Sequence, residues 1–265
     1  MKYILYIIGL VGLATIATPC LAAPTSIYNS SLISTTSLMD YYRLNGNAND
    51  YKGTANGTAT GVTFSTAASP FSDGSDGGDF TANTTGNTTA NAYITANYFS
   101  PNASNFTYYC WVEFRSTVSQ IQQFLMNEEN GATGKPSVGM YLTSSGHFAF
   151  FYTNSSNGYT VTSSLTAVLD KWYQVAMTES NNTLTGYVNG VSVGSVAIVT
   201  PTIDSTNGNG QIGRRYNSAY SSTQWPFNGY EADVAMFNTA LTSTEISSLY
   251  GAPIPSFSPW QFFPF

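Results

Sequence analysis

The chain has 265 residues, of which only 8% are charged, and its formal charge is −6 at pH 7. Its eight Lys and Arg argue against a nucleic-acid-binding protein, because phosphate recognition needs clustered positive charge. Solubility must come from uncharged polar side chains, and stability is expected to depend weakly on salt and on moderate acidity. The length favours one domain with tails, of a size that single all-β domains routinely reach.

Residues 1–22 have the pattern of a secretory signal peptide. Lys2 supplies the positive start, an apolar run follows from Ile4 to Ala17, and Cys20 and Ala22 place small residues at −3 and −1 of a cleavage site. An uncleaved signal that anchors the protein in a membrane is the alternative. The sequence predicts a secreted protein of the extracellular space, the cell surface or a virion surface.

Residues 23–37 are rich in Ser and Thr and predict a linker or a leading strand. Gly-rich and Asn-rich loops then separate short apolar segments. These segments predict strands at residues 38–44 and 62–64, from Phe80, and at 93–95.

A longer strand is predicted from Phe106 to Phe114, where alternate residues share a face. Phe106, Tyr108, Cys110, Val112 and Phe114 form one face. Once the signal is removed, Cys110 is the only cysteine and forms no internal disulfide. Its position suits a small, buried hydrophobic side chain, and a reactive thiol is the alternative interpretation.

The second half of the chain predicts further strands and one helix. Asn189-Gly190 indicates a tight hairpin, because both central residues of a type I′ turn need positive φ. A capping box of Thr242 and Glu245 begins the helix, and we expect its apolar face to plug one open end of the fold. The strands are predicted at residues 124–126, 138–142, 147–152, 172–178, 184–188, 210–213 and 230–237.

Several motifs resemble one family in the family's order. They are Phe-Thr-x-x-x-Trp-Val from Phe106, Trp-x-x-Val-Ala-x-Thr from Trp172, Tyr-Val-Asn-Gly from Tyr187, Ile212-Gly213, and the closing strand from Phe227 followed by the helix. Together, residues 38–251 resemble the laminin-G-like (concanavalin A-like lectin/glucanase) jelly-roll domains. The resemblance implies an all-β, antiparallel two-sheet sandwich with one short C-terminal helix.

The family that this chain resembles includes glycoside hydrolases, which use a pair of carboxylates for catalysis. Glu231 and Asp233 are two apart on a strand, which predicts that both line the concave face. Ala235 and Met236 occupy the places of a third carboxylate, so a glycoside hydrolase is only a remote alternative. His147 is the only histidine and fits a structural residue at a strand start.

Calcium is the ion that the resemblance implies, bound by loop oxygens. The candidate ligands are Asp73, Asp76 and Asp79, with Asp50 in an earlier loop. Their spacing differs from an EF-hand loop, and a solvated acidic turn is the alternative interpretation.

The candidate ligand-binding residues are Arg214, Arg215, Tyr216, Tyr220 and Trp225, before the closing strand. Aromatic rings stack on sugar faces, and arginines can bond to hydroxyls or carboxylates. The resemblance implies a non-enzymatic binding or adhesion protein with glycan or surface-protein partners. The alternative interpretation is that these loop residues only cover the core.

The last stretch, residues 252–265, lies beyond the resemblance and is rich in aromatics and proline. It could pack on its own domain, dock into a neighbouring copy, or act as a sorting or anchoring signal. A structural subunit of a filament, surface layer or virion coat, assembled from copies of this chain, is therefore the rival function. The candidate assembly residues are Phe257, Trp260, Phe262, Phe263 and Phe265.

Overall fold

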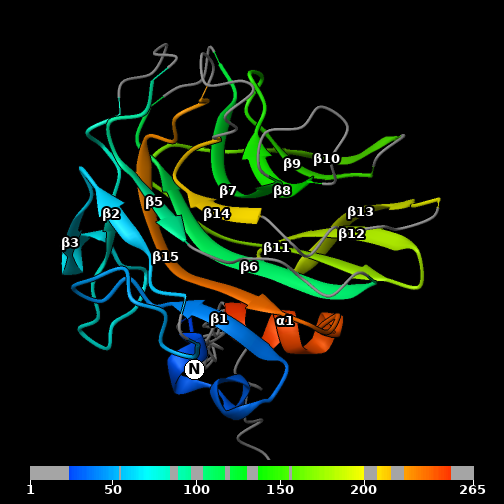
Figure 1. Ribbon diagram of the computed structural model, residues 1–265, viewed down its shortest axis with the longest axis horizontal. Helices are drawn as coiled ribbons and strands as arrows, with labels where there is room; N and C mark the ends of the chain where they lie inside the picture. Colours follow the sequence, from blue (N-terminus) through cyan, green and yellow to red (C-terminus); the bar gives the residue numbers. More distant parts are fainter. Residues whose placement is uncertain are drawn as a thin grey trace, which may run out of the picture.

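The computed structural model describes residues 24–53, 55–83, 89–96, 104–116, 120–129, 137–154, 157–199, 208–215 and 224–251. Two antiparallel sheets lie face to face, with one short helix outside them (Figure 1). This confirms the predicted all-β sandwich. The predicted signal peptide, the tail at residues 252–265, Tyr216 and Tyr220 lie outside the described residues.

The eight-stranded sheet has the order β13-β12-β11-β6-β15-β4-β3, with β1 also paired to β15. Its strands are β1 (Leu38–Tyr42), β3 (Thr63–Ser65), β4 (Gly77–Asp79), β6 (Asn105–Phe114), β11 (Trp172–Ser180), β12 (Thr183–Val188), β13 (Val191–Ala197) and β15 (Gly229–Phe237). Phe80 follows β4 instead of starting a strand, which corrects that prediction.

The seven-stranded sheet has the order β10-β9-β8-β7-β14-β5-β2. Its strands are β2 (Thr58–Thr60), β5 (Tyr93–Ala96), β7 (Gln122–Glu129), β8 (Ser137–Leu142), β9 (His147–Thr153), β10 (Gly158–Thr166) and β14 (Gly208–Ile212). In both sheets the strand order differs from the chain order, so about half of the neighbouring strands are distant in sequence.

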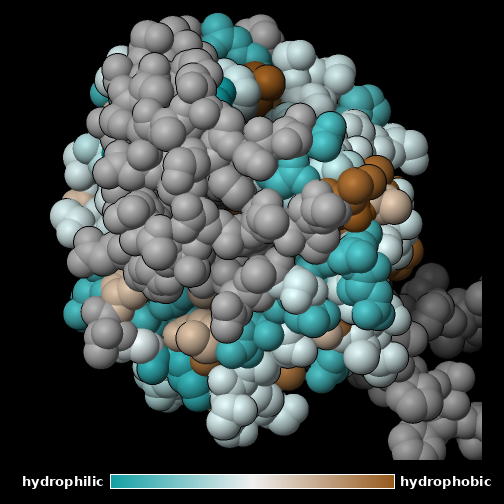
Figure 2. Space-filling model, turned by 45° about the vertical axis from the view of Figure 1, so that its right-hand side comes forward, coloured by the Kyte–Doolittle hydropathy of each residue, from teal (hydrophilic) through white to brown (hydrophobic). Residues whose placement is uncertain are grey.

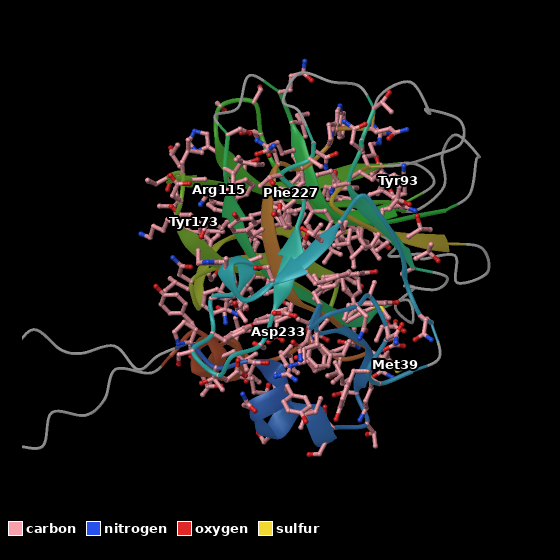
Figure 3. All side chains as sticks on the ribbon, turned by 90° about the vertical axis from the view of Figure 1, so that its left-hand side faces the viewer. Met39, Tyr93, Arg115, Tyr173, Phe227 and Asp233 are labelled. Carbon is pink, nitrogen blue, oxygen red and sulfur yellow. The ribbon has the colours of Figure 1, made fainter. Side chains whose placement is uncertain are left out.

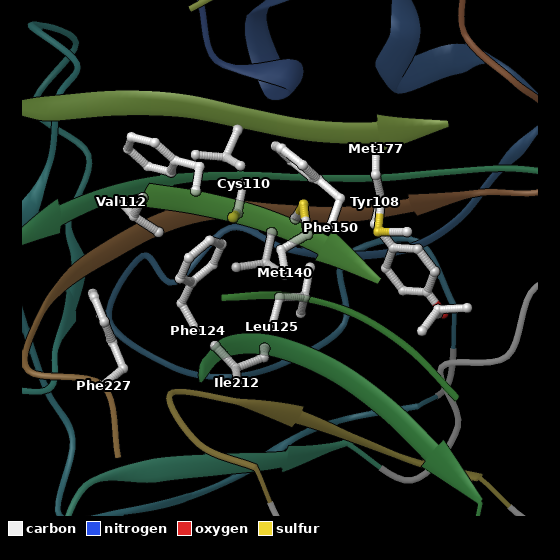
Figure 4. Packing of buried hydrophobic residues seen from close by; sticks show 14 of the residues in the cluster. Tyr108, Cys110, Val112, Phe124, Leu125, Met140, Phe150, Met177, Ile212 and Phe227 are labelled. Carbon is white, nitrogen blue, oxygen red and sulfur yellow. The ribbon is translucent and has the colours of Figure 1, made fainter. Parts of the chain in front are cut away.

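The main core lies between the two sheets (Figure 4). The predicted inner face of β6 is confirmed, because Phe106, Tyr108, Cys110, Val112 and Phe114 are all fully buried there. The hairpin at Asn189 and Gly190 also has positive φ at both residues, 52° and 76°, as the sequence predicts. Period-two alternation therefore located the inner face of β6 correctly.

A second apolar layer covers the outer face of the eight-stranded sheet. Tyr109 and Trp111 point to this side of β6 and pack with Ile246 and Leu249 of the helix α1 (Ser243–Tyr250). The Trp111 ring is stacked on Tyr250, with ring centres 6.0 Å apart. The expectation that the helix plugs an open end is therefore wrong, because two large outward aromatics require a cover on the sheet face itself.

The N-terminal segment completes this cover. Residues predicted as a linker or leading strand form two short 3-10 helices, η1 (Ile27–Asn29) and η2 (Ser31–Ser34). Their buried residues, Ile27 and Leu32, join the outer layer. A third 3-10 helix, η3, spans Thr66–Ala68. None of the described helices combines the length and the apolarity needed to cross a membrane.

The capping box of α1 is present, as predicted. The Thr242 side chain accepts a hydrogen bond from Glu245 N at 3.2 Å, and Glu245 accepts one from Thr242 N at 2.7 Å. We expect Thr242→Ala to lower the free energy of unfolding by about 1 kcal/mol, measured by urea denaturation. Thr244→Ala, in the same helical turn but outside the box, is the control, and an equal loss in both variants would contradict a capping role.

Candidate functional site

A groove on the outer face of the seven-stranded sheet brings aromatic side chains together. Val138, Met140 and Leu142 of β8 point into the core, so Tyr141 points outward, and Phe151 of β9 does the same. The groove has a volume of about 250 Å³. Its lining residues are Ser137, Tyr141, Phe151, Thr153, Thr160, Arg215 and Trp225.

The aromatic rings of the groove are in mutual contact. The Tyr141 ring lies 5.8 Å from Phe151 and 6.5 Å from Trp225, measured between ring centres. Gly139 makes the approach of Phe151 possible, because a Cβ there would lie 2.6 Å from Phe151 Cε1. Burial raises the pKa of Tyr141, so its phenol stays neutral and can donate a hydrogen bond.

Trp225 has a strained backbone. Its φ is 43°, in the left-handed region that bulky residues rarely adopt. The conformation is held from both sides, since Gln123 N donates to Trp225 O at 2.9 Å and Arg215 N donates to Gln224 O at 2.7 Å. Strain of this kind persists only where the surrounding structure fixes it, and it concentrates at functional sites.

Arg215 and Trp225, both predicted as candidate ligand-binding residues, are brought together. The guanidinium carbon of Arg215 lies 4.4 Å from the Trp225 ring centre. This contact places a positive charge and five potential hydrogen-bond donors beside the aromatic rings. The groove therefore combines apolar faces with donors and hydroxyls, and no Asp or Glu is among its described lining residues.

Arg214, the neighbouring candidate, points elsewhere. Its side chain is 7% exposed, its guanidinium carbon lies 3.2 Å from the Tyr93 ring centre, and its Nε donates to Gln211 Oε1 at 2.9 Å. We therefore correct that prediction, because the side chain is used to hold β14 against β5. Consecutive residues point in different directions here, and only Arg215 reaches the groove.

A second hollow of about 220 Å³ lies at the turn between β8 and β9. It is lined by Phe114, Leu142, Leu169 and small or hydroxyl side chains, with no charged residue among those described. It contains no aromatic stack with a donor beside it. We therefore place the candidate site in the groove.

The candidate calcium ligands do not form one site. Asp50 accepts hydrogen bonds from the backbone nitrogens of Tyr41 and Lys52, each at 3.0 Å. Asp73 bonds to Ser75, and Asp79 bonds to Thr81, in short local turns. Across the residues that the structure describes, no group of three or more His, Cys, Asp and Glu could hold a metal ion. Asp76, the remaining candidate ligand, belongs to no such group either.

The expected carboxylate pair is wrong in its geometry. Glu231 lies beside Cys110 at the inner face, where both are fully buried. Asp233 is also fully buried, but it bonds to Ser26 and Ile27 on the outer face. The register between β15 and β6 shifts at this place and Asp233 has φ of 55°, so a β-bulge sends the two carboxyls to opposite sides.

Sequence reasoning missed Tyr141 and Phe151 as site residues. A signal was available, because each is an aromatic at an outward position of a strand whose inward positions are already apolar. Such a residue has no core to fill. What the sequence lacked was the packing that brings the hairpin of β8 and β9 near the segment before β15.

Comparison with known proteins supports the fold. Residues 85–247 match the family Laminin_G_3, described as the concanavalin A-like lectin/glucanases superfamily. The match covers more than half of the chain, and the chain belongs to this family. No curated protein matches it.

Solved structures with similar folds share little sequence with this chain. Domain 4 of AbnA, a GH43 extracellular arabinanase from Geobacillus stearothermophilus in complex with arabinotriose, has a TM-score of 0.61 at 16% identity, covering 81% of this chain and 98% of that one. The binding domain of botulinum neurotoxin serotype G has a TM-score of 0.53 at 18% identity, covering 76% and 47%. The binding domain of Paraclostridial Mosquitocidal Protein 1 has a TM-score of 0.52 at 17% identity, covering 74% and 47%.

Proposed function

We propose that this chain is a non-enzymatic, glycan-binding protein that uses the groove formed by β8, β9 and Trp225. The observation that supports the proposal best is the Tyr141–Trp225 aromatic surface with Arg215 stacked against it. A sugar ring presents an apolar face that stacks on aromatic rings and hydroxyls that bond to Arg, Ser and Thr. The volume of about 250 Å³ lies just below the range of small-molecule sites and suits a single sugar ring.

The chemistry of the groove supports binding without hydrolysis. A glycosidase of the usual kind needs two carboxyl groups on either side of the bond that it cleaves. The described lining of the groove offers hydroxyls, aromatic rings and one guanidinium instead. The match to the concanavalin A-like lectin/glucanases superfamily, and the domain of an arabinanase that was solved with arabinotriose, agree with a glycan as the partner.

The proposal places the protein outside the cell, on the strength of the signal-like pattern of residues 1–22. Figure 2 shows hydrophobic residues on one face as separate spots between polar ones. An extended apolar surface of the kind used for large protein interfaces is not visible on the described part of that face.

The test is a glycan array, followed by titration of the best-bound oligosaccharide. We expect Trp225→Ala to weaken binding by about tenfold or more, equivalent to about 1.4 kcal/mol, because it removes the stacking surface and the support of Arg215. Trp172→Ala is the matched control, since Trp172 stacks on Tyr230 on the other sheet. Circular dichroism should show both variants folded. Binding that is equally strong in both variants, or no glycan bound at all, would remove the groove from the account.

A further inference from the structure

A larger cavity, separate from the groove and from the hollow between β8 and β9, lies at the loop that follows β1. Its volume is about 400 Å³, within the range of small-molecule sites. It is unrelated to the aromatic groove, because β1 pairs with β15 of the eight-stranded sheet. In Figure 1, β1 lies in the lower part of the molecule and β8 and β9 in the upper part. The lining residues are Arg43, Leu44, Asn45, Asn47, Asn49, Asp50 and Tyr51.

The backbone strain seen at the groove occurs here as well. Of the described non-glycine residues with positive φ, Leu44 and Trp225 are the two that are neither Asp nor Asn, with φ of 60° and 43°. Asp and Asn adopt this region readily, whereas a branched or bulky residue is strained there. Leu44 is 1% exposed and packs in the main core, so its strain is fixed by the fold. Each cavity thus has one strained bulky residue in its wall.

The loop around the cavity is held in place by its own hydrogen bonds. Asp50 accepts from the backbone nitrogens of Tyr41, Lys52 and Ala55 at 3.0, 3.0 and 3.3 Å. Asn47 Oδ1 accepts from Asn49 N at 2.9 Å. A cavity with a fixed wall loses little conformational entropy when a ligand binds.

Polar donors on this wall face solvent. Asn45, Asn47 and Asn49 are all exposed. Asn45 Oδ1 accepts from Asp76 N at 3.0 Å, which orients that amide and leaves its nitrogen on the other side. Amide groups carry both donors and acceptors, as sugar hydroxyls do.

Tyr51 gives the cavity an aromatic wall. Its side chain is 56% exposed, although it is a large ring. Edge-to-face contacts with Tyr28 and Tyr41, at 5.3 and 6.0 Å between ring centres, hold it in one orientation. Arg43 supports Tyr28 from 4.0 Å and lies 3.4 Å from the Asp73 carboxylate. The charge of Arg43 is therefore balanced locally, and the carboxylate of Asp50 is occupied by the backbone.

We propose that this cavity is a second carbohydrate site, specific for a neutral sugar residue. Tyr51 stacks on the apolar face of the ring, and the amides of Asn45 and Asn49 bond to its hydroxyls. Because Arg43 is paired with Asp73, and the Asp50 carboxylate in the same wall has no ion pair among the described residues, an acidic sugar gains no attraction over a neutral one. This site goes beyond the groove and does not depend on it. If both sites are occupied, one chain holds two sugars on different sheets.

The test is an NMR titration of the full protein with a mixture of methyl glycosides of glucose, galactose, mannose and N-acetylglucosamine at millimolar concentrations. We expect shifts of the amide signals of Asn45, Asn47 and Asn49. Tyr51→Ala should weaken this response by about tenfold, equivalent to about 1.4 kcal/mol. Met39→Ala is the control, because Met39 lies in β1, is 43% exposed and does not line the cavity. Methyl glucuronide should bind no more tightly than its neutral counterpart.

The outcomes for the two sites are separable in the same titration. The cavity is reported by the Asn amides and removed by Tyr51→Ala, whereas the groove is reported by the Trp225 indole and removed by Trp225→Ala. Silent Asn signals in the wild-type protein, or a response that survives Tyr51→Ala, would overturn the cavity proposal whatever the groove does. A clear preference for methyl glucuronide would overturn its assignment to neutral sugars.

Discussion

Asp233→Ala should lower the free energy of unfolding by about 3–5 kcal/mol, because a buried hydrogen-bond acceptor for three groups is lost. Asp233 accepts from Ser26 Oγ at 2.9 Å, from Ile27 N at 2.6 Å and from the Tyr41 hydroxyl. All three partners are at most 1% exposed, so water does not replace the carboxylate without a rearrangement. Figure 3 shows Asp233 next to the N-terminal segment that these bonds hold.

The same substitution should release the N-terminal segment from the sheet. We expect limited proteolysis to cut within residues 24–34 of Asp233→Ala and not of the wild type, and urea denaturation to give the stability difference. Asp233→Asn separates two causes of the loss, because Asn also tolerates the left-handed φ of 55° but bonds less well. A loss below about 1 kcal/mol in Asp233→Ala, with the segment still protected, would show that the hydrogen bonds do not anchor it.

Glu231→Gln should change how stability depends on pH. Glu231 is fully buried in the main core, and this burial raises its pKa well above the usual value of 4.5. Among the described residues, neither of its carboxyl oxygens has a hydrogen-bond partner of good geometry, although the Cys110 thiol lies beside it. Above pH 4.5 the folded protein therefore keeps a proton that the unfolded chain has released.

The sign of this effect follows from proton linkage. A raised folded-state pKa gives full stability below the unfolded-state pKa, and stability then falls by about 1.4 kcal/mol per pH unit until the folded-state pKa is passed. Asp233, whose pKa burial raises to about 6, adds to the same decline at lower pH. The low charge of the chain alone predicts that the free energy of unfolding depends weakly on acidity. The two buried carboxyls change that expectation. The protein should be most stable in mild acid.

The measurement is the free energy of unfolding in urea from pH 5 to pH 9. The wild-type curve should fall as the pH rises from 5, and the Glu231→Gln curve should be flatter and cross above it, since the amide needs no proton. Glu113→Gln is the control, because Glu113 is an acidic residue of the same sheet that is ion-paired with Arg115 at 2.8 Å. Parallel wild-type and Glu231→Gln curves would contradict a protonated Glu231.

The aromatic groove shows how far the sequence reaches toward a site. Arg215 and Trp225 could be named from the sequence, because an aromatic and basic loop before the last strand is visible as a pattern. Tyr141 and Phe151 could not be assigned to the same site, because they lie on two other strands far from that loop in sequence. Side-chain alternation tells which way a residue points, and not which strands lie next to one another.

The carboxylates of β15 show a different limit. Glu231 and Asp233 are two apart, so a regular strand would place them on one face. The β-bulge between Ala232 and Ala235 inserts one residue into that strand, and period-two counting fails beyond it. The sequence carries no clear mark of this bulge, since a left-handed Asp is ordinary in turns.

By itself, the sequence determined the all-β fold, the inner face of β6, the hairpin at Asn189 and the capped helix, because each depends on neighbouring residues and on local periodicity. Only the tertiary structure decided where the helix docks, on which side of the sheet each buried carboxyl lies, and which side chains line the groove and the cavity. These features depend on strand order, register and backbone strain, which are set by contacts between segments distant in the chain. Local physics therefore specified the elements of this lectin-like sandwich, and the packing of those elements specified its candidate sites.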